Sequence, residues 1–278
     1  MARAHATAGG KLSNPEFEIP LERLPPGFAR SVEELPADVA VPRPAATAVL
    51  MRDADPAPEV LLLQRQRTTG FVPGAYVFPG GRVDAADAAV AVAGDDDALM
   101  QYRVAAIREV FEETGVLLAR DAAGGWAPDC VTDPGLEVWR ERLMSGAATL
   151  GDVLADRRLV PAVEQLAYFS HWITPVVEPR RYDTRFFLAA LPRGRIVRAD
   201  PREMIEAVWL TVEEALRRFE AGTLPMVFPT VRTLQALQEY TTVEAALDAA
   251  SRTEVKPVLP RLVRTRTGVG IVIDEEMR

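Results

Sequence analysis

The sequence has few of the residues that bind soft metals or form cross-links. It contains one cysteine, Cys130, and two histidines, His5 and His171, among 278 residues. A single cysteine excludes an intramolecular disulfide, and nothing in the composition points to an oxidising compartment. A zinc site built from thiolate and imidazole ligands is nearly excluded for the same reason. Any metal chemistry is therefore expected at oxygen ligands.

Long apolar runs and basic clusters are also missing. No apolar run approaches 18 residues, and the start MARAHATAGG lacks the hydrophobic core of a signal peptide. These absences predict a cytoplasmic protein that neither spans nor binds a membrane. The net charge is −8, and no run of Lys or Arg resembles a nucleic-acid footprint, so binding to a nucleic-acid duplex is not expected. An acidic protein that handles an anionic phosphate substrate needs a cation or a few well-placed arginines.

The pattern of apolar runs and turn residues predicts an arm followed by one domain. Residues 1–40 hold scattered prolines and little periodicity, which predicts an extended or loosely ordered arm. Residues 41–278 read as a single domain of mixed α/β class, with a mixed sheet covered by helices on both faces. Strands are expected over residues 46–51, 60–65, 116–118, 165–173, 185–191 and 207–211, with a terminal hairpin around 264–270. Helices are expected over residues 85–93, 96–114, 134–145, 149–158, 212–220, 229–240 and 243–252.

The segment 96–114 is the strongest helix candidate, and it carries an acidic cluster. At 100° per residue its apolar side chains fall on one side, and Glu109, Glu112 and Glu113 fall on the opposite side. Three carboxylates so close together repel by roughly 3 kcal/mol per pair at an effective dielectric near 20. In a cleft, such a cluster needs a cation. Oxygen ligands without imidazole or thiolate favour Mg²⁺ or Mn²⁺.

Acidic residues opposite an apolar stripe are usually only a solvated helix face. The full string here is Arg108-Glu109-Val110-Phe111-Glu112-Glu113-Thr114-Gly115-Val116. The pattern R-E-apolar-x-E-E-x-G-apolar should arise by chance in only about one chain in 10⁵. The string therefore indicates a functional motif, and Gly115 is placed to end the helix in a left-handed conformation.

With Pro79-Gly80-Gly81 upstream, the string resembles the Nudix box, G-x₅-E-x₇-R-E-U-x-E-E-x-G-U, in which U is apolar. Gly81 takes the first position, and Asp87 stands where the family has Glu. Residues 88–107 then exceed the seven positions of the pattern by 13, so the box carries an insertion at about residues 88–100. A rival register begins at Gly94, but it places Met100 on the acidic position.

Further stretches resemble a Nudix branch related to peroxisomal coenzyme A diphosphatase, which also has an interrupted box. They are LLLQRQRTTGFVPGAYVFPGGRVDAAD before the box, SHWITPVVEPRRYDTRFFLAAL after it, and the terminal PVLPRLVRTRTGVGIVI. One departure concerns the substrate, because Gly70 occupies the place of an arginine in the general coenzyme A signature. The resemblance covers about residues 45–275.

The resemblance implies an α/β/α sandwich with additional C-terminal helices and a terminal hairpin, and a hydrolase that cuts a diphosphate bond in a nucleotide-linked small molecule. It makes Glu109, Glu112 and Glu113 ligands of Mg²⁺ or Mn²⁺, one of them serving as general base, with Arg108 placed to orient Glu112. Weaker candidates for phosphate contact are Arg65, Arg67, Gly80, Gly81, Arg180 and Arg181. Weaker candidates for an additional acid are Asp87, Asp183, Glu203 and Glu206.

The sequence leaves several alternatives open. The substrate is coenzyme A or an acyl derivative in one interpretation and ADP-ribose or NADH in another. A third interpretation is a non-catalytic ligand sensor with the same fold, although such sensors commonly lose the box glutamates that this chain retains. A homodimer is also left open.

Overall fold

The computed structural model describes residues 17–21, 28, 32–34, 38–67, 73–90 and 98–273. Within these residues the chain forms two compact units. One unit gathers the described residues up to Val41 with Ile173–Arg181 and the C-terminal segment from Val258, and the other comprises Pro42–Trp172 and Tyr182–Pro257. The prediction of one domain after residue 40 stays a prediction.

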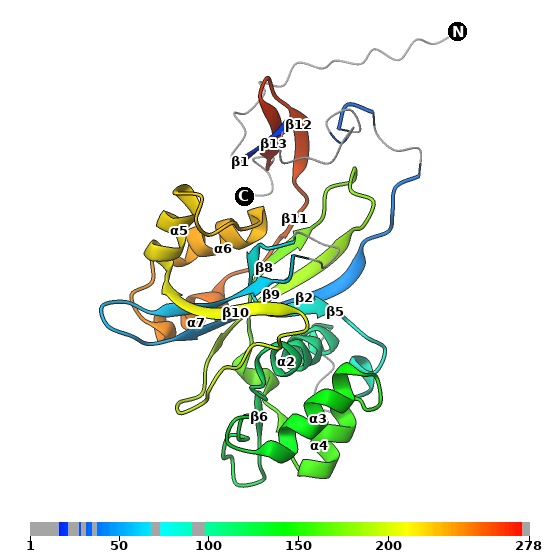
Figure 1. Cartoon of the computed structure of the whole chain (residues 1–278), viewed down its shortest axis with the longest axis vertical. Helices are drawn as coiled ribbons and strands as arrows, with labels where there is room; N and C mark the ends of the chain where they lie inside the picture. The colour runs from blue at the N-terminus through cyan, green and yellow to red at the C-terminus, as the bar shows by residue number, and fades with distance from the viewer. Residues whose placement is uncertain are drawn as a thin grey trace. The chain divides into compact units, whose positions relative to one another are not determined.

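The larger unit is built on a mixed sheet, which confirms the predicted fold class (Figure 1). Its strand order is β10-β3-β2-β9-β8-β11, with β4 paired to β3 and β5 paired to β2. Parallel pairing joins β2 to β9, and antiparallel pairing joins β2 to β3 and β5 and joins β3 to β10. The strands are β2 (Arg43–Arg52), β3 (Glu59–Arg65), β4 (Tyr76–Val77), β5 (Gly80–Arg82), β8 (Ala167–Ile173), β9 (Tyr182–Ala190), β10 (Met204–Thr211) and β11 (Pro257–Val258).

Helices cover both faces of this sheet. In Figure 1, α2 lies on one side with α3 and α4, and α5 and α6 lie on the other side. The strand β2 is buried from Ala45 to Met51 apart from the half-buried Thr47, as expected for a central strand covered on both faces. The helices are α2 (Met100–Thr114), α3 (Pro134–Met144), α4 (Leu150–Arg157), α5 (Val212–Glu220), α6 (Phe228–Leu237) and α7 (Val243–Arg252), with short 3₁₀ turns η2 (Asp87–Ala89) and η3 (Val163–Gln165).

Local sequence explains where several helices begin. A threonine side chain accepts a hydrogen bond from the backbone of the first turn in α4, α5 and α7, at Thr149, Thr211 and Thr242. Asp133 caps α3 in the same way, and Pro134 then occupies its first position. These residues satisfy amide groups that have no partner inside the helix, which fixes the start of each helix.

The smaller unit contains the terminal hairpin, as predicted. Its strands are β12 (Arg261–Arg264) and β13 (Gly268–Val272), and β1 (Phe17–Pro20) pairs antiparallel with β13. Part of the predicted extended arm is therefore a sheet strand, and residues 1–16 lie outside the described residues. An ordered third strand at β1 was not predicted, because its partner lies at the other end of the sequence.

The predictions around the acidic helix have different outcomes. Residues 102–114 form one continuous helix inside α2, and Gly115 ends it at φ 72°, both as predicted. Gly94 and the acidic run at residues 95–97 of the predicted insertion lie outside the described residues. The predicted strand at residues 116–118 is wrong. Val116 makes only an isolated bridge to Asp129, and the short strand β6 (Ala119–Arg120) begins later and pairs with β7 (Val160–Pro161).

Candidate functional site

The helix α2 positions the acidic cluster, but this cluster does not lie on a solvated face. The predicted apolar side is buried, and so are Arg108 and Glu113 on the opposite side. Glu113 is 3% exposed. The helix is enclosed because the sheet packs against one side while β5, η2 and α3 contact others. Glu113 is therefore held inside the protein, and Glu109 and Glu112 are half-buried with side-chain exposures of 13% and 18%, which a solvated helix face would not require.

Arg108 donates hydrogen bonds to several acidic side chains on and beside α2. Its Nε and Nη2 donate to the two carboxylate oxygens of Asp87, each at 2.9 Å. Its Nη1 donates to Glu109 Oε1 at 2.7 Å and to Glu112 Oε1 at 3.4 Å. Burial by itself would lower the pKa of Arg108, but the Asp87 hydrogen bonds and the charges of Glu109 and Glu112 outweigh it and raise that pKa. The guanidinium therefore stays charged and fixes several carboxylates at once.

The glycines before η2 bring the backbone close to these carboxylates. Gly80 N–H donates to Glu113 Oε2 at 3.1 Å. A Cβ on Gly81 would lie 2.5 Å from the Glu109 carboxyl carbon, and one on Gly80 would lie 2.5 Å from the Ala46 carbonyl oxygen. Only residues without a side chain allow this approach, which gives the Pro-Gly-Gly turn a physical reason.

Burial and mutual repulsion raise the pKa values of the three glutamates. Burial raises the pKa of Glu109 to about 7 against the opposing charge of Arg108, and the charge of Glu112 adds to the rise. Burial, followed by the charge of Glu109, raises the pKa of Glu113 well above its ordinary value. Burial also raises the pKa of Glu112. Without a cation, the cluster favours bound protons over full ionisation.

The structure brings two of the four additional acids to this cluster. Asp200 N–H donates to the Glu113 carbonyl oxygen, which places the segment that carries Glu203 at the end of α2, and the charge of Glu203 raises the pKa of all three glutamates. Asp87 is 1% exposed and binds Arg108, which favours the box register that begins at Gly81 over the register at Gly94.

The other two additional acids have partners of their own. Asp183 contacts His171 and lies 2.9 Å from Arg185 Nη1. Glu206 accepts a hydrogen bond from the Tyr76 hydroxyl. The largest contributions to the pKa shifts of the three box glutamates come from other groups. A role for Asp183 or Glu206 as an additional acid stays a prediction.

The predicted arginines are in different environments. The charge of Arg65 lowers the pKa of Glu113, and the buried Nε of Arg65 has no hydrogen-bond partner among the described residues. The Cγ of Arg67 lies 3.7 Å from a Cβ built on Gly74, in the loop before the glycine turn. Arg180 and Arg181 belong to the smaller unit, where Arg181 donates to the carbonyls of Thr174 and Ala40. Arg65 is therefore the candidate arginine whose charge acts on the cluster.

The glutamates match a hard cation in ligand type, but they are not arranged as a coordination shell. Among the residues that the structure describes, no group of three or more His, Cys, Asp or Glu side chains could already hold a metal ion. Glu109 and Glu112 accept from Arg108 through Oε1, and Glu113 accepts from Gly80 through Oε2. Each of these contacts engages one carboxylate oxygen. Buried carboxylates with raised pKa values are suited to exchange protons for Mg²⁺ or Mn²⁺.

Sequence reasoning missed Arg140, the largest fully buried side chain in the described part of the chain. It lies on α3, and its Nε donates to the Glu112 carbonyl oxygen at 2.8 Å. A signal was present, because Arg140 shares one helix face with the buried Leu136 and Leu143. An arginine within an apolar stripe indicates a buried polar contact.

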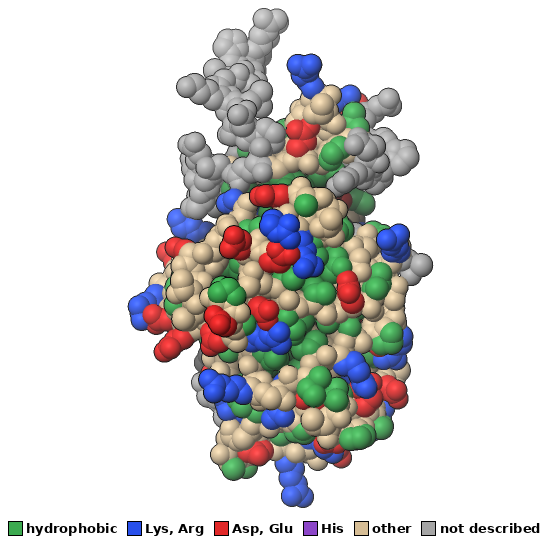
Figure 2. Space-filling view, turned by 60° about the vertical axis from the view of Figure 1, so that its left-hand side comes forward, with side chains coloured by type: hydrophobic (Ala, Val, Ile, Leu, Met, Phe, Trp, Pro, Cys, Tyr) green, Lys and Arg blue, Asp and Glu red, His purple; other side chains and the backbone are tan. Residues whose placement is uncertain are grey.

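The surface shows no single-sign charge field on the face in Figure 2. Lys and Arg side chains are interspersed there with Asp and Glu side chains and with apolar ones. This mixture matches the absence of basic runs from the sequence. Within the described segments, no helix is long and apolar enough to cross a membrane.

Two family models match the part of the chain that contains the acidic helix α2. The model of the NUDT19 Nudix domain matches residues 92–237, and the model of the NUDIX domain matches residues 41–129. A solved Nudix hydrolase from Alicyclobacillus acidocaldarius is 32% identical, with a TM-score of 0.67 over 76% of this chain and 97% of that chain. Its fold likeness agrees with the mixed sheet and its covering helices.

Curated relatives include two acyl-coenzyme A diphosphatases. The NUDT19 protein of Gallus gallus is 31% identical over 221 residues, which cover 62% of this chain and 58% of that protein. The NUDT19 protein of Homo sapiens is 31% identical over 206 residues, which cover 58% of this chain and 55% of that protein. The similarity thus spans less than two thirds of the length of these relatives.

Proposed function

Because the chain belongs to the Nudix family, within the group that the NUDT19 Nudix domain describes, we propose that it hydrolyses a diphosphate bond in a nucleotide-linked small molecule with the help of Mg²⁺ or Mn²⁺. The supporting observation is the cluster of the buried Glu113 with the half-buried Glu109 and Glu112, all with raised pKa values to which the charge of Glu203 contributes. Buried like charges are retained at a cost, and a cation-dependent reaction gives them a purpose.

In this proposal some residues hold the cation and others keep those residues in place. Glu109, Glu112 and Glu113 hold the cation, and Glu203 supplies a fourth carboxylate from the segment before β10. A bound Mg²⁺ would neutralise charge on the phosphoryl oxygens and make a bound water more acidic. Arg108 keeps Glu109 and Glu112 in place, and Asp87 keeps Arg108 in place. Phosphoryl transfer asks mainly for such positioning and charge stabilisation.

The reaction adds water across the diphosphate. Water attacks one phosphorus, the P–O bond to the bridging oxygen breaks, and two phosphomonoesters form with release of a proton. One glutamate of the cluster accepts the proton of the attacking water. Its raised pKa suits this task, because a general base acts best when its pKa lies near the working pH.

Coenzyme A or an acyl derivative is the proposed substrate. Support comes from the relatives named acyl-coenzyme A diphosphatase and from the sequence stretches before and after the box. Arg65 is suited to contact a phosphate because its charge acts on Glu113 and its buried Nε has no hydrogen-bond partner among the described residues. A charge-assisted contact of this kind contributes about 1.5–3 kcal/mol.

A substrate screen tests the proposal. Full-length protein is incubated at equal Mg²⁺ with coenzyme A, its dephosphorylated form, acetyl-coenzyme A, ADP-ribose and NADH, and the products are identified by mass. We expect phosphopantetheine and adenosine bisphosphate from coenzyme A, and no products with excess chelator. A tenfold preference for ADP-ribose or NADH would contradict coenzyme A as the proposed substrate, and the proposed hydrolase activity would stand. Tight binding of these compounds without any cleavage would indicate a ligand sensor instead.

A further inference from the structure

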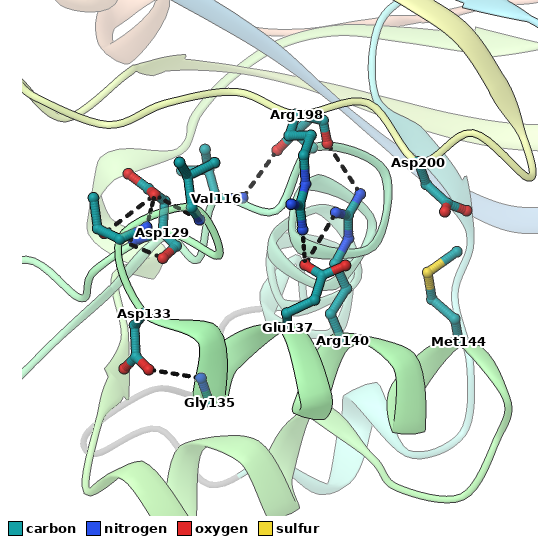
Figure 3. Close-up of polar contacts among 12 residues, drawn as sticks. Val116, Asp129, Asp133, Gly135, Glu137, Arg140, Met144, Arg198 and Asp200 are labelled. Atoms are coloured by element: carbon teal, nitrogen blue, oxygen red, sulfur yellow. Dashed lines mark hydrogen bonds and ion pairs between the residues drawn. The ribbon is translucent and has the colours of Figure 1, made fainter.

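Arg140 joins two separate segments beside the carboxylate cluster. Its Nε donates to the Glu112 carbonyl oxygen on α2 at 2.8 Å, and its Nη2 donates to the Arg198 carbonyl oxygen at 3.2 Å. Its Nη1 lies 3.5 Å from Glu137 Oε2, which also pairs with Arg198 Nη2 at 2.5 Å. Figure 3 shows the side chains of Arg140 and Arg198 side by side above the carboxylate of Glu137. One buried guanidinium thus connects α2, α3 and the segment around Arg198.

That segment continues the contact with the end of α2. Arg198 N–H donates to the Thr114 carbonyl oxygen at 2.8 Å. Asp200 N–H donates to the Glu113 carbonyl oxygen at 3.1 Å, and Glu203 N–H then donates to the Asp200 carbonyl oxygen at 3.2 Å. The last carbonyl groups of a helix have no partner within it, and here Arg140 and the segment supply partners. The buried positive charge of Arg140 is also favourable at the negative end of the helix dipole.

The same segment determines where Glu203 lies. The side chain of Glu203 is exposed, whereas its backbone carbonyl oxygen accepts a hydrogen bond from Gln66 N–H at 2.9 Å. Its distance from Glu109, Glu112 and Glu113 therefore depends on the backbone that carries it. The end of α2 and the edge of β3 fix that backbone, and Arg140 is the side chain that ties the beginning of the segment to α2.

We infer that Arg140 is a positioning residue, which acts through the backbone of residues 198–203 to fix the position of Glu203 relative to Glu109, Glu112 and Glu113. This inference rests on the proposed function, because it concerns the cation site of the same cluster. An arginine suits the role because its planar group donates in several fixed directions. A lysine ammonium on a shorter side chain would keep the charge without bridging both carbonyl oxygens in the same geometry.

The test compares Arg140→Met and Arg140→Lys with the wild-type protein. Mn²⁺ binding is measured by the loss of the free-ion paramagnetic resonance signal, and turnover of coenzyme A is measured separately as kcat and KM. Residues that support metal ligands typically change affinity or activity about 10- to 100-fold when replaced. We expect a loss of that size in Mn²⁺ affinity and in kcat for both variants, with KM changed less than about threefold. Arg140→Lys keeps the buried charge and addresses the risk that Arg140→Met does not fold.

Two additional variants separate positioning from general support of the fold. Arg142→Met removes an exposed arginine from the same helix and should leave Mn²⁺ affinity and kcat unchanged. Glu203→Gln removes the group through which Arg140 is inferred to act. The double variant Arg140→Lys with Glu203→Gln should then lose no more than about twofold beyond Glu203→Gln alone, because coupled residues are not additive.

The outcomes distinguish this inference from the proposed function. Additive losses in the double variant, or a lower melting temperature with unchanged Mn²⁺ affinity, would overturn the positioning role and leave the hydrolase intact. If the wild-type protein binds Mn²⁺ but cleaves no diphosphate, the proposed hydrolase activity is wrong. The Mn²⁺ affinities of the same variants still decide the role of Arg140. A wild-type protein that does not bind Mn²⁺ would overturn both.

Discussion

Arg108 and Asp87 form a bidentate ion pair in which both side chains are almost fully buried, at 7% and 1% exposure. The pair lies between residues that are distant in sequence, on α2 and on the turn η2. Arg108 also donates to the Arg82 carbonyl oxygen at 2.6 Å, which ties the end of β5 to the same guanidinium. The ion pair thus connects the glycine turn with the acidic helix.

Replacing Asp87 with Asn should destabilise the protein strongly. Without Asp87, the buried charge of Arg108 is balanced only by Glu109 and Glu112, and breaking a buried ion pair costs up to about 3–5 kcal/mol. Denaturant unfolding of the full chain measures the loss, and Asp84→Asn is the matched control because the Asp84 side chain is 58% exposed and 3.9 Å from Arg108. Equal stability of the Asp87 and Asp84 variants would contradict the assigned role of the pair.

Replacing Glu112 or Glu113 with Gln should remove nearly all turnover without unfolding the protein. Gln keeps the shape of the side chain but lacks the charge that holds a cation. Loss of a metal ligand should raise the barrier by several kcal/mol, or about 10³-fold in kcat. Turnover and melting temperature are measured together, with the exposed Glu141→Gln on α3 as the control. Wild-type turnover of either variant in saturating Mg²⁺ would remove these glutamates from the site.

Replacing Gly81 with Ala should reduce activity more than stability. The added Cβ would lie 2.5 Å from the Glu109 carboxyl carbon, so the carboxylate must move. A shift of about 1 Å in a reacting group costs up to about 10²-fold in rate. Gly151→Ala is the matched control, because its Cβ would meet nothing closer than 3.5 Å. It lies inside α4, where Ala in place of Gly favours the helix by about 0.5–1 kcal/mol. Unchanged kcat in Gly81→Ala would show that Glu109 does not need its observed position.

The sequence predicted those parts of the fold that local signals determine. The helices at residues 212–220 and 243–252 have the predicted bounds, because Thr211 and Thr242 mark their starts. The strand predicted at residues 116–118 was wrong because a short apolar run can be either a buried connection or a strand, and composition alone does not distinguish them. The strand β5 was missed because two of its three residues are glycines and its partner β2 lies far away in sequence.

For the candidate site, the sequence named the residues but not their environment. Helical spacing placed Glu109, Glu112 and Glu113 together, yet it also put them opposite the core, whereas the structure buries Glu113 and half-buries the other two. That difference arises from β5 and η2, whose packing against α2 is a tertiary contact that helix periodicity does not encode. The position of Glu203 beside the cluster depends in the same way on backbone contacts between distant segments.

The stability of the metal-free protein should fall as the pH rises from about 5 to about 8. The folded-state pKa of Glu109 is raised to about 7, so the folded protein binds more protons than the unfolded chain between the two pKa values. Stability then decreases with increasing pH across that interval, by about 3 kcal/mol in order of magnitude. Unfolding in chelator at a series of pH values measures the slope, and Glu109→Gln should flatten it.

Added Mg²⁺ should reverse this trend. A cation competes with protons for the same oxygens, so it should bind and stabilise the folded protein more strongly at about pH 8 than at about pH 5.5. The measurement is the rise in melting temperature on adding Mg²⁺ at each pH. Glu109→Gln should reduce the rise at the higher pH because it removes one ligand and one competing proton. An equal rise at both pH values in the wild-type protein would place the cation away from Glu109.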